Sequence, residues 1–351
     1  MTLLAELPVI QAPMAGSQGS ALAIAVSNAG GVGSLPCALL APDAIRAELS
    51  AITSATGKPY NVNFFVHREP VVDAERESAW RAILAPYYRE LGVDPAAIPV
   101  QAGRTRFDED TAAVLEAFRP PVVSFHFGLP AAALLRRVQS RGSRVIASAT
   151  TVAEARYLEA QGVDAIIAQG LEAGGHRGMF LTEDLASQVG TLALVRQVVQ
   201  AVRVPVIAAG GIADAAGVRA ALALGAVAAQ VGTAYLPCPE AATSAVHRAA
   251  LKAPGADLTA LTNLFTGRPA RGVVNRLMRE LGPMSAAAPA FPLASGAIVP
   301  LRARAEAQGS GDFSGLWAGQ NIRRGADLPA AQLTRELADP GIAGRPAGRG
   351  R

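Results

Sequence analysis

One local pattern recurs along this chain and restricts the folds open to it. From residue 144 to residue 233 the sequence passes repeatedly through a short apolar strand, a polar or glycine-rich turn, a helix and a glycine that ends the helix. Parallel strands that are covered on both faces read as continuous apolar runs. Such strands alternating with helices predict an α/β fold built on a parallel sheet.

The same alternation, less regular, extends back to the N-terminus and gives eight predicted strands. They cover residues 8–13, 32–35, 60–66, 121–127, 144–150, 165–170, 204–210 and 226–233. Eight strand–helix units in about 250 residues are typical of a (β/α)8 TIM barrel. An open doubly wound sheet is the alternative, although such sheets more often stop at about five to seven strands. We therefore predict a TIM barrel.

The alternation stops after residue 254, which divides the chain. Residues 1–254 are predicted to form the barrel. Residues 255–310 carry helical pieces and proline-rich breaks, and are predicted to form a small helical lobe over the barrel mouth. Residues 311–338 are predicted to be a C-terminal helical segment that packs back on the barrel. Residues 339–351 lack apolar periodicity and are predicted to be a flexible tail.

Composition and charge exclude several classes of partner. The net charge is +4, and the arginines are scattered without a basic stripe interleaved with aromatic residues, so no nucleic-acid partner is predicted. No uninterrupted apolar run is long enough to span a membrane, and no secretory signal is recognised. The two cysteines, Cys37 and Cys238, are far apart, which indicates a reducing cytoplasm and neither a disulfide scaffold nor a zinc site. The oligomeric state stays open, a homodimer included.

Two histidines lie on or next to the loops that follow the strands, which form the active site in barrels of this kind. His126 ends the fourth strand, and His176 lies on the flexible, glycine-rich turn after the sixth. Both are predicted to be catalytic, because an imidazole titrates near neutral pH. His67 is expected at the surface, and His247 is expected to be partly exposed or to lie at a hinge. No HxH, HExxH or carboxylate cluster accompanies them, so no metal is predicted.

Two further loops have the composition of a phosphate site. Gly210 and Gly211 follow the seventh strand, and Gly232 and Thr233 follow the eighth. Loops at these positions commonly hold a phosphate, because their backbone N–H groups can approach it closely. The alternative is that these glycines only make tight turns. We predict a ligand that carries a phosphate.

Seven motifs in a fixed order resemble one family. QAPMAG (11–16), AVSNAGGVGS (25–34), NVNFF (61–65), VSFHFG (123–128), AQGLEAGGHRG (168–178), VIAAGGI (206–212) and QVGT (230–233) together resemble the FMN-dependent nitronate monooxygenases, formerly called 2-nitropropane dioxygenases. The resemblance continues at residues 266–275 and 317–320. It departs from the family at residues 291–300, which are apolar where members carry tyrosines and a lysine, and at His247, which replaces a helix tyrosine.

The resemblance implies a cofactor and a role for each predicted site residue. FMN would be held in the barrel, with its phosphate on Gly210, Gly211, Gly232 and Thr233. The flavin ring would lie against Pro13, Met14 and Ala15, and ring or ribityl chain would contact Asn63, Gln169, Gly174 and Gln230. His176 would serve the substrate as base or hydrogen-bond partner, with His126 near the same substrate.

The implied reaction is the oxidation by O2 of an alkyl nitronate, of the propionate 3-nitronate type, to a carbonyl compound and nitrite through a flavin semiquinone. A flavin reductase of the same superfamily, using NAD(P)H on a quinone or an enoyl-acyl-carrier-protein, is the first alternative. QAPM in the first loop and HRG after the second glycine favour the nitronate enzyme. A flavin-free lyase or isomerase acting on a phosphorylated substrate is the second alternative. Such an enzyme would usually need a Schiff-base lysine or a carboxylate at the end of a strand, and the lysines Lys58 and Lys252 do not follow strands. A barrel that only binds a ligand is a third.

Overall fold

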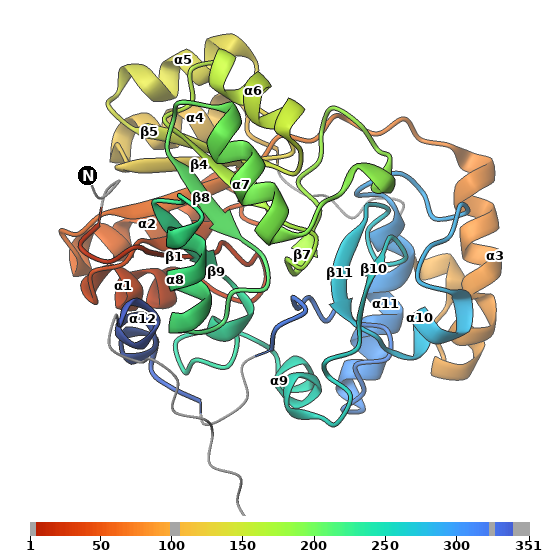
Figure 1. Ribbon diagram of the computed structural model, residues 1–351. Helices are drawn as coiled ribbons and strands as arrows, with labels where there is room; N and C mark the ends of the chain where they lie inside the picture. Colours follow the sequence, from red (N-terminus) through yellow and green to blue (C-terminus); the bar gives the residue numbers. More distant parts are fainter. Residues whose placement is uncertain (1–4, 99–105, 323–326, 340–351) are drawn as a thin grey trace, which may run out of the picture.

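The computed structural model describes residues 5–98, 106–322 and 327–339, and the predicted tail lies outside them except for its first residue. Eight parallel strands form one sheet in the order β1-β9-β8-β6-β5-β4-β3-β2 (Figure 1). Their bounds are β1 Val9–Gln11, β2 Gly33–Pro36, β3 Tyr60–Phe65, β4 Val122–His126, β5 Arg144–Ala149, β6 Ala165–Gln169, β8 Val206–Ala209 and β9 Ala228–Val231. Each falls within a predicted strand or one residue from it.

The sheet closes on itself between its first and last strands. Ile10 of β1 pairs in parallel with Val32, one residue before β2. The backbone N–H of Gln11 donates to the carbonyl of Val32 at 2.9 Å, and the N–H of Val32 donates to Val9 at 3.0 Å. The predicted TIM barrel is therefore confirmed, and the open doubly wound sheet is excluded.

Helices surround the barrel on the outside. They are α1 Ser20–Asn28, α2 Pro42–Ala55, α4 Glu109–Phe118, α5 Ala132–Ser140, α6 Val152–Ala160, α7 Thr191–Ala201, α8 Ala215–Ala223 and, near the mouth, α9 Ala245–Lys252. The C-terminal helix α12 (Ala330–Ala338) packs against α1, α8 and β1. In the described part of the chain, no helix combines the length and the apolarity that a bilayer crossing requires.

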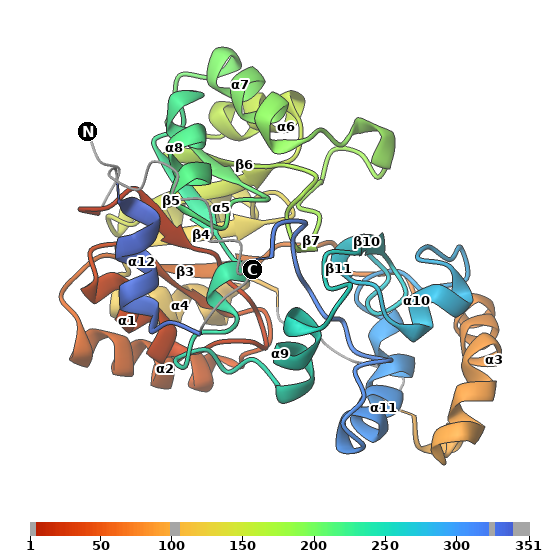
Figure 2. The same cartoon turned by 60° about the horizontal axis from the view of Figure 1, so that its bottom comes forward.

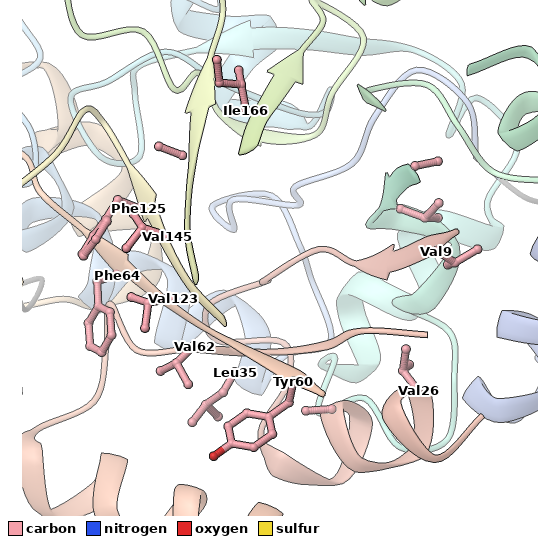
Figure 3. Packing of buried hydrophobic residues seen from close by; sticks show 14 of the residues in the cluster. Val9, Val26, Leu35, Tyr60, Val62, Phe64, Val123, Phe125, Val145 and Ile166 are labelled. Carbon is pink, nitrogen blue, oxygen red and sulfur yellow. The ribbon is translucent and has the colours of Figure 1, made fainter. Parts of the chain in front are cut away.

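The strands alternate between two apolar layers because successive side chains of a strand point to opposite faces. Val123, Val145 and Ile166, labelled in Figure 3, share a cluster with helix residues such as Leu158 and Leu194, so they lie between the sheet and the helices. Their neighbours Ile146 and Ile167 belong to a separate cluster formed mainly by strand residues, which fills the barrel interior. Burial on both faces explains why these strands read as continuous apolar runs.

The lobe differs from the prediction, since it contains strands as well as helices. Strands β10 (Thr259–Thr262) and β11 (Ala270–Val273) pair antiparallel, and β7 (Gly175–His176) adds to β11. Helices α10 (Arg276–Leu281) and α11 (Ala294–Ala307) follow. β10 is only partly buried, so its four residues carry no apolar run that would predict a strand.

Helix α3 (Ala74–Leu91) also belongs to the lobe, although its place in the sequence put it in the predicted barrel domain. Figures 1 and 2 both show α3 beside α11, away from the barrel strands. Trp80 and Leu84 share an apolar cluster with Leu301, and the Tyr88 hydroxyl donates to the Ala297 carbonyl at 2.8 Å. An amphipathic stripe predicts that a face is buried, but not which partner covers it.

Candidate active site

A cavity opens at the carboxyl ends of the barrel strands and contains about 1210 Å³ of space not filled by atoms, part of it open to solvent. The thirteen residues that the sequence analysis predicted as site residues all line it. They are Pro13, Met14, Ala15, Asn63, His126, Gln169, Gly174, His176, Gly210, Gly211, Gln230, Gly232 and Thr233. Residues distant in sequence therefore converge on one site, although lining a cavity does not assign a role.

The loop after β6 is fixed by hydrogen bonds within itself. The side chain of Arg177 is fully buried and donates to the carbonyls of Gly170 at 2.7 Å and Gln169 at 2.8 Å. The amide of Gln169 donates to the carbonyl of His176 at 3.0 Å and accepts from the N–H of Gly178 at 2.8 Å. Both ends of this amide therefore hold the loop.

His176 is not on a flexible turn, which corrects the sequence-based expectation. It forms β7 with Gly175, pairs with Ala270 of β11 and is 8 % exposed. The N–H of Arg177 donates to the Pro269 carbonyl at 2.8 Å. The lobe supplies these partners from about 90 residues further along the chain, so no local pattern predicts them.

The His176 ring is held on several sides. Its Nε2 lies 2.9 Å from the hydroxyl oxygen of Thr266. The centroids of Phe291 and Trp317 lie 5.2 and 5.5 Å from its own, and Phe65 lies at 6.1 Å. An imidazole restrained in this way presents one orientation to the cavity.

His126 uses both ring nitrogens in contacts with the protein. Nε2 lies 3.2 Å from the carbonyl oxygen of His176, and Nδ1 lies 3.0 Å from Oγ of Ser148. A carbonyl only accepts, so Nε2 carries the proton and Nδ1 accepts from the Ser148 hydroxyl. Burial lowers the pKa of His126 to about 3, and the charges of Arg268 and Arg177 lower it further, while the bond to His176 opposes the shift. The ring is therefore neutral at neutral pH.

The loop after β8 has the backbone conformation that requires glycine, whereas Gly232 after β9 has a φ of -113°, which any residue can adopt. Gly210 and Gly211 have φ angles of 122° and 67°, where side chains other than glycine are strained. The segment from Trp317 to Asn321 covers these loops. Asn321 donates from Nδ2 to the Gly211 carbonyl at 2.9 Å, and the Gly319 N–H donates to Oγ1 of Thr233 at 2.9 Å.

Two histidines differ from their predicted surroundings. His247, expected to be partly exposed or at a hinge, is 6 % exposed and lines the cavity. His67, expected at the surface, is 7 % exposed, and its ring centroid lies 4.9 Å from that of Phe291. His67 therefore packs against a lobe residue, and His247 bonds to the backbone of Trp317 in the segment that follows the lobe.

Sequence reasoning missed several residues that surround the cavity. Ser148, Trp317, Gly319 and Asn321 line it, and Thr266 supports His176. Thr266 and Trp317 stand in motifs that resemble the family, but nothing in the motifs indicated their contacts. Within the described ranges, no three His, Cys, Asp or Glu side chains gather as a metal site would require.

Comparison with known proteins agrees with this geometry. The sequence profile of nitronate monooxygenase matches residues 1–339. A nitronate monooxygenase of Pseudomonas aeruginosa is 45 % identical over 95 % of this chain and 96 % of its own. The crystal structure of a nitroalkane oxidase from Streptomyces ansochromogenes superposes with a TM-score of 0.88 at 40 % identity, covering 96 % of each chain. FabK from Thermotoga maritima superposes less well, with a TM-score of 0.69 at 28 % identity over 95 % of this chain and 93 % of its own.

The match extends over the barrel and the lobe together, and the reductase and lyase alternatives are not favoured. The chain belongs to the nitronate monooxygenase family and is an oxidoreductase that oxidises nitronates with a flavin cofactor.

Proposed function

We propose that this protein binds FMN in the cavity and uses O2 to oxidise alkyl nitronates to a carbonyl compound and nitrite. FMN, when bound, accepts electrons from the nitronate. The observation that carries the proposal is the convergence of all thirteen predicted residues on one cavity at the strand ends. The residues of this chain bind both molecules, orient them and exclude water.

The loops after β8 and β9 suit the phosphate of FMN. Gly210 and Gly211 present backbone without side chains, which lets N–H groups approach an anion. Thr233 accepts from the Gly319 N–H, so its own hydroxyl proton stays available to donate to a phosphate oxygen. Asn321 fixes the carbonyl of Gly211 from the other side.

Polar groups deeper in the cavity suit the ribityl chain and the ring. Oε1 of Gln230 is buried and has no hydrogen-bond partner among the described residues, so it can accept from a hydroxyl or a ring N–H. Asn63 donates its amide to Ser124 at 2.9 Å, which leaves its oxygen as an acceptor. Pro13, Met14 and Ala15 offer an apolar surface to the flavin.

We assign different roles to the two predicted catalytic histidines. His176 faces the substrate as its hydrogen-bond partner or base, oriented by the Thr266 hydroxyl. His126 is a positioning residue, because both its nitrogens bond to protein atoms and its neutral ring holds the His176 carbonyl. This departs from the catalytic role that the sequence predicted for His126.

Cofactor analysis and turnover test the proposal together. Heating the purified protein should release one FMN per chain, identified by chromatography and mass. Ethyl nitronate should then give nitrite and acetaldehyde with O2 uptake. A protein that cannot be loaded with FMN, or one that oxidises no nitronate when loaded, would contradict the proposal. Rapid bleaching of the flavin by anaerobic NADH would instead favour the reductase alternative.

We keep the cytoplasm as the predicted compartment, which suits the two free cysteines, Cys37 and Cys238.

A further inference from the structure

Among the described residues, the titratable side chains of the cavity wall are three histidines, His126, His176 and His247. In the part of the chain that the structure describes, none of its lining residues is Asp, Glu, Lys or Arg. The histidines His126 and His247 both have a pKa lowered by burial, to about 3 and about 4. At neutral pH both imidazoles are uncharged. Apart from His176, which we place against the nitronate group itself, these walls offer a ligand dipoles and apolar surface.

His247 adds a polar atom without adding charge. It lies on α9, is 6 % exposed, and its Nε2 makes no hydrogen bond with a described residue. Leu236 and Trp317 line the same cavity. A neutral imidazole in such surroundings can bond to one polar group of a ligand, but it cannot neutralise an anion.

The aromatic cluster behind His176 is equally unsuited to a second anion. Phe65 lines the cavity and packs on Phe127 with centroids 4.7 Å apart. Phe291, the first residue of the apolar segment 291–300, lies 5.4 Å from Phe127 and 5.2 Å from the His176 ring. Aromatic rings desolvate a carboxylate without replacing its hydrogen bonds.

Three arginines nevertheless lie near the site without lining the cavity, and two of them, Arg177 and Arg271, are buried. Arg177 and Arg271 donate to backbone carbonyls of the β6 loop, and Arg268 lies 4.2 Å over the Phe127 ring and bonds to the Met179 carbonyl. None of the three forms an ion pair within the described ranges. Arg268 and Arg177 lower the pKa of His126, so their field reaches the cavity wall. They favour negative charge in the cavity, although none of them lines it and each donates hydrogen bonds to backbone carbonyls.

We infer that the substrate is a nitronate that carries no charge besides its nitronate group, with an apolar substituent against the aromatic cluster. This inference rests on the proposed function and narrows it. A single delocalised negative charge gains from the arginine field and from the polar groups of the cavity. A second charge, such as the carboxylate of propionate 3-nitronate, would lose water against the aromatic cluster and find no Lys or Arg among the described lining residues to replace it.

Two nitronates of similar size test the inference on the FMN-loaded enzyme. In 3-methylbutyl nitronate, two methyl groups replace the two carboxylate oxygens of propionate 3-nitronate. We expect kcat/KM, from O2 uptake at neutral pH, to be at least tenfold higher for the methyl compound. Equal values, or a preference for the carboxylate, would overturn the inference while leaving the proposed function intact. Absence of turnover with both would overturn the proposed function itself.

A charge placed in the cavity tests the physical reason. His247→Arg adds a cation to the wall, and His247→Gln is the matched neutral control. We expect H247R to raise the carboxylate-to-methyl ratio of kcat/KM at least tenfold and H247Q to leave it near the wild-type value. An unchanged ratio in an FMN-loaded H247R would contradict the inference. If H247R does not fold, Leu236→Lys supplies the cation from another lining position.

Discussion

Nε2 of His126 lies 3.2 Å from the backbone carbonyl oxygen of His176, so one predicted histidine holds the main chain of the other. His126 ends a barrel strand, whereas His176 lies on β7, which pairs with the lobe. This contact therefore connects the barrel to the lobe at the site. Gly178 lies close beside it, since a Cβ there would come within 2.8 Å of the His126 ring.

Replacing His126 tests its positioning role. His126→Phe keeps a ring against Phe127, at 4.5 Å, but removes the bonds to Ser148 and His176. The His176 carbonyl keeps the amide of Gln169 as a donor but loses the imidazole, so we expect a loss of about 1–3 kcal/mol in the free energy of unfolding. Turnover should fall while FMN stays bound and the pH profile of kcat keeps its shape. Urea unfolding and O2 uptake measure these effects, and a profile that lost one of its limbs would show proton transfer by His126 instead.

Thr266 should control the orientation of the His176 ring. Thr266→Val keeps the shape of the side chain but removes the hydroxyl 2.9 Å from Nε2. We expect kcat to fall roughly tenfold, the size of effect that about 1.4 kcal/mol of lost hydrogen bonding produces. Thr266→Ser retains the hydroxyl and should restore most of the activity. Equal rates in the valine and serine variants would remove Thr266 from the mechanism.

The barrel was predictable because its signals are local. A strand of four to six residues buried on both faces leaves an apolar run, and the loops that follow it carry glycine where φ is positive, as at Gly210 and Gly211. Because parallel strands end at the same face of a barrel, loops far apart in sequence were expected to meet. All thirteen predicted site residues line the cavity for that reason.

The lobe was less predictable because its signals are not local. The two residues of β7 form a strand only because β11 pairs with them, and β10 is too exposed to show an apolar run. His247 and His67 are buried by parts of the chain that pack on them only after folding. A sequence pattern gives the periodicity of a segment, but the burial of a single polar side chain depends on what covers it.

Gly211 offers a test of the predicted phosphate loop. Its φ of 67° makes alanine strained there, and a Cβ would come within 3.2 Å of the Glu172 side chain. Gly211→Ala should weaken FMN binding about tenfold or more, because the loop would shift. Gly142→Ala is the matched control, since Gly142 has a φ of 85° and open space around its Cβ, remote from the cavity. FMN titration of both variants separates strain at a positive φ from the position of the loop. Equal dissociation constants for the two variants would mean that Gly211 does not form part of the phosphate site.

The neutral state of His247 should appear as a pH dependence of stability. Burial lowers its pKa to about 4, and Arg248 adds to this shift, while the Trp317 backbone and Glu306 oppose it. In the unfolded chain the pKa of a histidine is about 6.5. Because the folded pKa is the lower one, the unfolded state gains the proton first as the pH falls. The contribution of His247 is therefore complete above about pH 6.5 and is lost progressively between there and about pH 4.

The expected size of this loss follows from linkage. Between pH 7 and pH 5 a histidine of this kind costs about 2 kcal/mol of unfolding free energy. Urea unfolding of wild type and His247→Gln at both pH values isolates the contribution of His247 to the unfolding free energy, because glutamine is polar but does not titrate. The wild type should lose about 2 kcal/mol more than the variant over this interval. Identical losses would mean that His247 accepts a proton as readily in the folded protein as in the unfolded chain. His247 would then bring a positive charge to the cavity wall, contrary to its lowered pKa.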